Sequence, residues 1–283
     1  MKLDFRHNGF SCFNQKARPA LTPKFTRKYG FSQGRLTVPP EGQLQYFPQE
    51  DWRDELVNAG LLGCSFIELL VERQRNLSNP IWSISGRKEI TDLCKANGLR
   101  PYSVCLDYII DHSILDPIDN SGMHSVDECI KVACELGAEI LVLPLLEASA
   151  VTIANMPSMV KAAHRMGNLA LQHDIILCVE TLLSADALND FVNTIDMPNV
   201  KAVFDTGNRV LETVSLKDDI IKLGKNISHV HIKDKNRDGE NVVLGSGIVD
   251  FCRVFEGLIE IDYRGALNFE TNRGAVPLDT ARF

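Results

Sequence analysis

The sequence lacks several features that would place it quickly in a protein class. Its eight cysteines are scattered, with no CxxC pair, and most lie in apolar runs such as "GCSFIELL" and "IILCVE". This pattern argues against zinc fingers and a disulfide framework, and it predicts reduced cysteines in a cytoplasmic protein. No apolar run approaches the roughly 20 residues of a membrane span, so no membrane partner is expected.

An excess of basic residues is missing as well. The formal net charge is −7, so general attraction to nucleic acid is not expected. No glycine-rich phosphate loop follows the first apolar strand, which disfavours an open, doubly wound sheet. No linker or break in composition divides the 283 residues, of which 45% are hydrophobic, and this predicts one large domain.

The chain does contain a regular alternation of short apolar runs and amphipathic segments. The predicted strands are 28–36, 65–71, 100–107, 139–146, 175–181, 200–206, 228–234 and 266–272. The predicted helices between them are 50–60, 84–97, 124–136, 157–173, 184–195, 215–224 and 249–260. Apolar strands that alternate with helices are typical of a parallel sheet covered by helices, and eight such units indicate an α/β fold, the (β/α)8 TIM barrel.

The two ends of the chain depart from a regular barrel. Residues 1–27 form a basic, mixed segment, which we interpret as an N-terminal extension, and the single TIM-barrel domain spans 28–283. Only "RGAVPLDTARF" follows the eighth strand, so the final helix is expected to be shortened. A partner subunit or the N-terminal segment could cover the apolar surface left there, unless the chain is truncated. We expect a homo-oligomer, a dimer or a tetramer.

Four late strands end in ionisable residues. They are Glu180 in "CVET", Asp205 in "VFDTGN", His231 in "HVHIKD" and Glu270 in "NFET". Barrel active sites lie at the carboxyl ends of the strands, so these side chains are expected to meet. Three carboxylates and one imidazole without a thiolate suit a divalent ion such as Mn²⁺, Mg²⁺ or Co²⁺, which also relieves the repulsion between the carboxylates.

The same motifs carry a family resemblance. In their order along the chain, "VET", "DTGN", "HVHIKD", "GSGIVDF" and "GALNFET" resemble the xylose isomerase-like TIM-barrel superfamily of sugar and sugar-phosphate isomerases and epimerases. The sequence is most similar to ketose 3-epimerases and L-xylulose 5-phosphate 3-epimerases. The resemblance implies one divalent ion, Mn²⁺ or alternatively Mg²⁺, Co²⁺ or Zn²⁺, held by Glu180, Asp205, His231 and Glu270. His229, two residues deeper, is expected to be packed and hydrogen-bonded.

The predicted reaction follows from these residue types. Epimerisation beside a ketone needs one group to remove a carbon-bound proton and another to return it, and Glu180 and Glu270 could supply both. We predict a metal-dependent isomerase or epimerase of a small keto-sugar or sugar phosphate that acts through a metal-stabilised cis-enediolate. The alternatives are an inosose or keto-sugar dehydratase, an apurinic endonuclease-like phosphodiesterase acting on DNA, and a non-catalytic sugar-binding barrel.

Further residues are candidates for binding substrate. Arg237 lies six residues after His231, where the resemblance places a substrate-contacting arginine, and Asn208 stands in place of a substrate-contacting histidine. Lys233 and Arg273, with the loop Gly245–Gly247, predict an anion site for a phosphate. The predicted substrate contacts are Asn208, Arg237, Lys233, Arg273, Glu68 and Glu147. Glu68 could alternatively form a core salt bridge. Arg35, Asp107 and Glu147 also end strands and could each reach the substrate, although solvation or helix capping is the ordinary role there.

Overall fold

All eight predicted strands are present in the computed structural model, which describes residues 28–40, 43 and 45–282. The predicted extension over residues 1–27 lies outside these described residues. The strands pair in parallel and close into a barrel in the order β1-β10-β7-β6-β5-β4-β3-β2, which confirms the TIM barrel. Their bounds are β1 Tyr29–Ser32, β2 Phe66–Val71, β3 Pro101–Leu106, β4 Ile140–Pro144, β5 Ile176–Glu180, β6 Val200–Asp205, β7 Ile227–Ile232 and β10 Ala266–Phe269.

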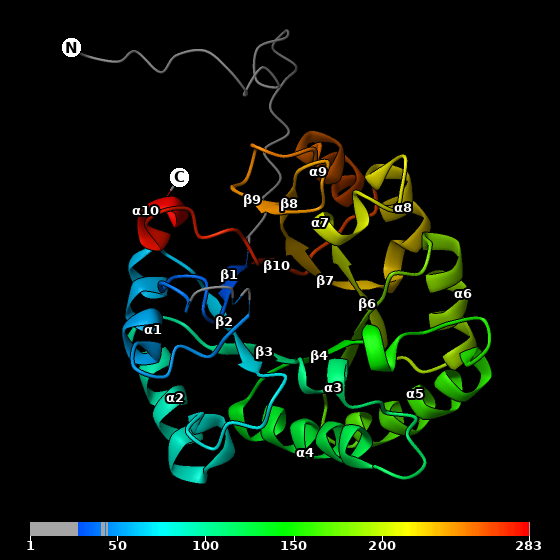
Figure 1. Cartoon of the computed structure of the whole chain (residues 1–283), viewed down its shortest axis with the longest axis horizontal. Helices are drawn as coiled ribbons and strands as arrows, with labels where there is room; N and C mark the ends of the chain where they lie inside the picture. The colour runs from blue at the N-terminus through cyan, green and yellow to red at the C-terminus, as the bar shows by residue number, and fades with distance from the viewer. Residues whose placement is uncertain (1–27, 41–42, 44, 283) are drawn as a thin grey trace, which may run out of the picture.

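The longer helices form a ring outside the barrel (Figure 1). They are α1 Trp52–Leu61, α2 Ile84–Ala96, α4 Ser121–Leu136, α5 Met156–Leu171, α6 Ala185–Ile195, α8 Leu216–Leu223 and α9 Phe251–Glu260. Among the described residues after β10, the chain forms one helix of five residues, α10, Pro277–Ala281, beside α1 (Figure 1). The shortened final helix is therefore confirmed.

Several short elements were not predicted, because they are too short to show a periodic pattern. One-turn helices follow two strands: α3, Tyr108–Asp111, after β3, and α7, Thr206–Arg209, after β6. An antiparallel hairpin of β8, Asp234–Lys235, and β9, Asn241–Val242, follows β7. Single 3-10 turns occupy Pro80–Trp82, Glu147–Ser149 and Gly224–Asn226. The short helices and the hairpin stand where the strands leave the barrel, which is where the site is built.

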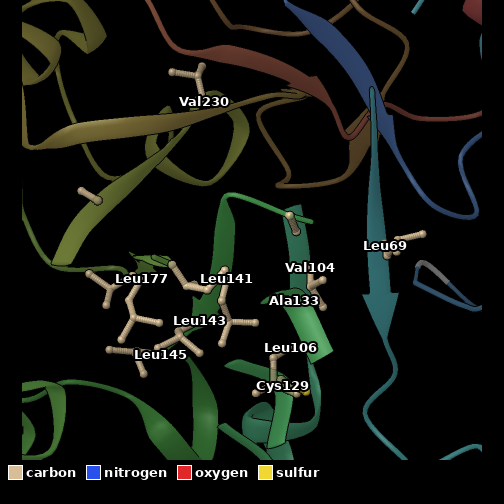
Figure 2. Packing of buried hydrophobic residues seen from close by; sticks show 14 of the residues in the cluster. Leu69, Val104, Leu106, Cys129, Ala133, Leu141, Leu143, Leu145, Leu177 and Val230 are labelled. Carbon is tan, nitrogen blue, oxygen red and sulfur yellow. The ribbon is translucent and has the colours of Figure 1, made fainter. Parts of the chain in front are cut away.

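The alternation of side chains along each strand creates two separate apolar cores. The outer core lies between strands and helices, and Figure 2 shows part of it, with Val104 and Leu106 of β3 near Cys129 and Ala133 of α4. The inner core consists of strand residues alone: Phe66, Leu70, Tyr102, Cys105, Ile140, Val142, Cys178, Val203 and Ala266. Because the barrel interior is filled, polar side chains can gather only near its carboxyl end and in the layer directly below.

The cysteines and the helices also test two expectations from composition. Six cysteines among the described residues are free thiols, five of them buried, which agrees with the expectation of reduced cysteines at those positions. Within the described part of the chain, the helices are too short or too polar to cross a membrane.

Candidate active site

The four predicted metal ligands converge at the carboxyl end of the barrel. Glu180 and Asp205 end β5 and β6, His231 lies near the end of β7, and Glu270 directly follows β10. His231 Nδ1 lies 3.1 Å from Glu270 Oε2, 3.9 Å from Asp205 Oδ2 and 4.0 Å from Glu180 Oε2. All four side chains are buried. Their convergence follows from the register, in which Asp205 of β6 pairs directly with His231 of β7.

The atoms of this cluster fit a divalent cation. Asp205 Oδ2 and His231 Nδ1 are buried, and each has a charged neighbour among the described residues: Lys233 Nζ lies 3.0 Å from Asp205 Oδ2, and Glu270 Oε2 lies 3.1 Å from His231 Nδ1. Glu180, Asp205 and His231 each offer a ligand atom within 4.8 Å of the others. Because carboxylate oxygen with imidazole nitrogen suits Mn²⁺ or Mg²⁺, these atoms are candidate metal ligands.

A second buried cluster lies one layer below. Glu68 of β2 is 2.8 Å from His229 Nε2 and 3.3 Å from His231 Nε2. Its carboxylate also accepts hydrogen bonds from Ser32, Ser103 and Asn268, so protein donors surround it. His229 is fully buried, as expected. Because Glu68 contacts Nε2 of His231, it orients the ring so that Nδ1 faces the three carboxylates, which is how carboxylates commonly support metal-binding histidines.

Lys233 places a buried ammonium beside two of the ligand candidates. Its Nζ lies 3.0 Å from Asp205 Oδ2 and 2.8 Å from Glu270 Oε1. Thr206 fixes its backbone, since Thr206 Oγ1 donates to Lys233 O and accepts from Lys233 N. A Cβ on Gly207 would lie 2.7 Å from Lys233 Cγ, so only glycine leaves room for the lysine stem. The threonine and glycine of the motif "DTGN" therefore hold the lysine of the motif "HIKD" in position.

Arg35 is a site residue that the predicted substrate contacts left out. The expected solvated or helix-capping role is wrong, because its side chain is fully buried and its NH2 atom lies 2.9 Å from Glu270 Oε1. Gln45 Nε2 donates to the same oxygen at 3.0 Å. Glu55 of α1 anchors the loop that carries Arg35, because its carboxylate accepts hydrogen bonds from the backbone N–H groups of Gly34 and Leu36. Sequence could not reveal this contact, since 235 residues separate Arg35 from Glu270.

The two candidate catalytic glutamates have opposite electrostatic surroundings. Burial, followed by the charge of Asp205, raises the pKa of Glu180 to about 7. Burial acts on Glu270 in the same direction, but Lys233, His231 and Arg35 together lower the pKa of Glu270 well below its usual range. Asn208 Nδ2 donates to Glu180 Oε1 at 2.7 Å, so this predicted substrate contact adjoins the site. In the absence of a bound ion, Glu270 therefore ionises more readily than Glu180.

The glycine loop does not form the predicted anion site. Its backbone amides instead point at Asp234, a fully buried residue at the start of β8. Asp234 Oδ2 accepts from Gly245 N and Gly247 N, and Oδ1 accepts from Val249 N. A Cβ on Gly247 would lie 2.2 Å from Asp234 Oδ1, which explains the glycine. Because these amides already have a carboxylate partner, they are not available to a substrate phosphate.

The remaining predicted substrate contacts lie in three different places. Arg237 is exposed in the turn between β8 and β9. Arg273 is buried, and its Nε donates to Gly34 O on the loop after β1. Glu147 is exposed and forms an ion pair with Arg73 at 2.7 Å, so it is not part of the buried cluster of ligand candidates.

The chain belongs to the xylose isomerase-like TIM barrel family, whose model matches residues 57–282. An L-ribulose 3-epimerase of Methylomonas sp. (strain DH-1) is 32% identical over 81 residues, or 29% of this chain and 27% of the relative. A D-psicose 3-epimerase of Enterocloster bolteae is 29% identical over 119 residues, or 39% of this chain and 38% of the relative. The matched segments therefore span well under half of either relative.

A solved structure shows the same fold over almost the whole chain. The D-psicose 3-epimerase with D-tagatose from Clostridium cellulolyticum H10 matches with a TM-score of 0.70 and 17% identity, over 90% of each chain. At this identity the likeness establishes the fold alone.

Proposed function

We propose that the protein is a divalent-metal-dependent epimerase of a small keto-sugar, acting on the carbon beside the ketone. The observation that carries this proposal is the pair of glutamates, Glu180 and Glu270, which approach one imidazole from β5 and β10 and have opposite pKa shifts. Two acid–base groups whose environments separate their pKa values are suited to give and take protons. The names of the two curated relatives, both ketose 3-epimerases, support the same reaction class.

The chain's own residues would divide the work as follows. Glu270, ionised and fixed by Lys233 and Arg35, removes the proton from the substrate carbon. Glu180, held by Asn208, returns a proton on the opposite face, and the reverse reaction exchanges the two roles. Asp205 and His231 complete the set of four ligands. The bound ion, for which we propose Mn²⁺ with Mg²⁺, Co²⁺ or Zn²⁺ as alternatives, supplies Lewis-acid polarisation of the carbonyl and neighbouring hydroxyl.

The experiment that tests this proposal follows interconversion of ketoses. Metal-free protein is incubated with D-psicose, D-fructose, D-tagatose, L-ribulose or L-xylulose, with and without added Mn²⁺, and the products are separated by chromatography. We expect the 3-epimer of at least one ketose to form with Mn²⁺ and none in chelator. Loss of water from the sugar, detected by mass, would instead indicate a dehydratase, and no product from any ketose would contradict the proposal.

A further inference from the structure

Asp107 is a buried carboxyl group that the proposed mechanism does not use. It directly follows β3, whose alternate residues face the barrel interior: Ser103 donates to Glu68, and Cys105 belongs to the inner core. Cys105 Sγ donates to Asp107 Oδ1 at 3.3 Å, so the carboxyl lies on the same inward side. Cys105 of β3 pairs with Val142 of β4. Two residues further along β4, Pro144 pairs with Glu180 of β5. Asp107 therefore stands level with Glu180.

The carboxyl of Asp107 has few partners for a buried charge. The residue is 4% exposed, and none of the ion pairs formed by described residues includes it. It stands at the N-cap position of α3 without making a side-chain cap, so the helix-capping role expected from sequence is wrong. Its partner is a thiol, which is a weak donor. Burial raises the pKa of Asp107 to about 6, as expected for an under-solvated carboxyl.

Two parts of the predicted anion site, Lys233 and the glycine loop, already have carboxylate partners. Lys233 lies between Asp205 and Glu270, and the glycine-loop amides are bound to Asp234. Arg35 donates to Glu270, to Gln45 and to the carbonyl of Thr271. An ionised Asp107 would add repulsion for a phosphate but would accept hydrogen bonds from sugar hydroxyl groups.

We propose that Asp107 is a specificity-determining residue whose carboxylate accepts hydrogen bonds from the hydroxyl groups of an unphosphorylated keto-sugar. The sugar lies between the Glu180–Glu270 pair and the end of β3, with its hydroxyl-bearing chain toward Asp107. This inference rests on the proposed function, and it narrows the substrate from a keto-sugar or its phosphate to the free keto-sugar.

The test compares Asp107→Asn and Asp107→Ala with Asp92→Asn, the same chemical change on an exposed residue of α2. For the ketose that the wild type converts best, each Asp107 variant should lower kcat/KM by about 10- to 100-fold, mainly through KM, because one or two charge-assisted hydrogen bonds are lost. The preference for that ketose over its terminal phosphate should fall in both variants. Asp92→Asn should match the wild type.

Melting temperature separates substrate binding from a structural role. Because the wild-type carboxylate is buried and Cys105 is its one weak side-chain donor among the described residues, Asp107→Asn should melt at or above the wild-type temperature at pH 8. A lower melting temperature accompanied by loss of activity, or unchanged kinetics, would overturn the inference while leaving the proposed function intact. A wild type that prefers the phosphate would overturn it as well. A wild type that neither converts nor, by calorimetry, binds any free ketose would overturn both proposals.

Discussion

Glu270→Gln and Glu180→Gln should each lower kcat for epimerisation by about 10²- to 10⁴-fold, the range usual for loss of a positioned acid–base group. An amide of the same shape cannot accept and return the proton, so both directions of the reaction should suffer equally. Initial rates at saturating ketose and Mn²⁺, measured from each epimer, check this expectation.

The control for these variants is Glu256→Gln on the exposed surface of α9, which should retain wild-type rates. Metal content must be measured for each variant, because both glutamates are also proposed ligands. A variant that binds Mn²⁺ and keeps kcat within threefold of wild type would contradict the role given to that glutamate. Such a result at Glu180 alone would favour a single base that serves both faces of the carbon.

Asp205→Asn should weaken Mn²⁺ binding by at least about 100-fold, because loss of a group outside the ligand shell already costs 10- to 100-fold. Asp205 has no proton-transfer role in the mechanism, so activity should return partly at high Mn²⁺. Calorimetric titration of metal-free protein gives the affinity, and the rise in melting temperature on adding Mn²⁺ should be lost in parallel.

Asp92→Asn on α2 should bind Mn²⁺ like the wild type. Equal affinity in wild type and Asp205→Asn would contradict the proposed ligand set. The alternative metal site would then be the lower cluster of Glu68, His229 and His231, which also offers three ligand atoms within 4.8 Å of one another. Glu68→Gln should then be the more damaging change for metal binding.

Local pattern was sufficient to predict the barrel and the meeting of the four ligand candidates. Each strand is a short apolar run, and an ionisable residue at its carboxyl end must lie at the same end of a closed parallel barrel as its counterparts. That rule brings Glu180, Asp205, His231 and Glu270 together without knowledge of any single contact.

Contacts between distant residues explain what sequence could not predict. The spacing of Gly245 and Gly247 suits a phosphate loop, but whether amides face solvent or a carboxylate depends on the fold, and here Asp234 fills that place. Arg35 reaches Glu270 across the closure of the barrel between β1 and β10. The lack of strong hydrogen-bond donors around Asp107 also depends on the fold, so the motif "CLDY" does not reveal it.

The most direct test of the account is the fate of the hydrogen on carbon 3. Metal-loaded protein is incubated in D₂O with the ketose it converts best, the metal is removed, and deuterium is located by NMR. Proton transfer between Glu180 and Glu270 predicts deuterium at carbon 3 of the product epimer. Epimerisation without deuterium at carbon 3, or deuterium confined to carbon 1, would contradict it.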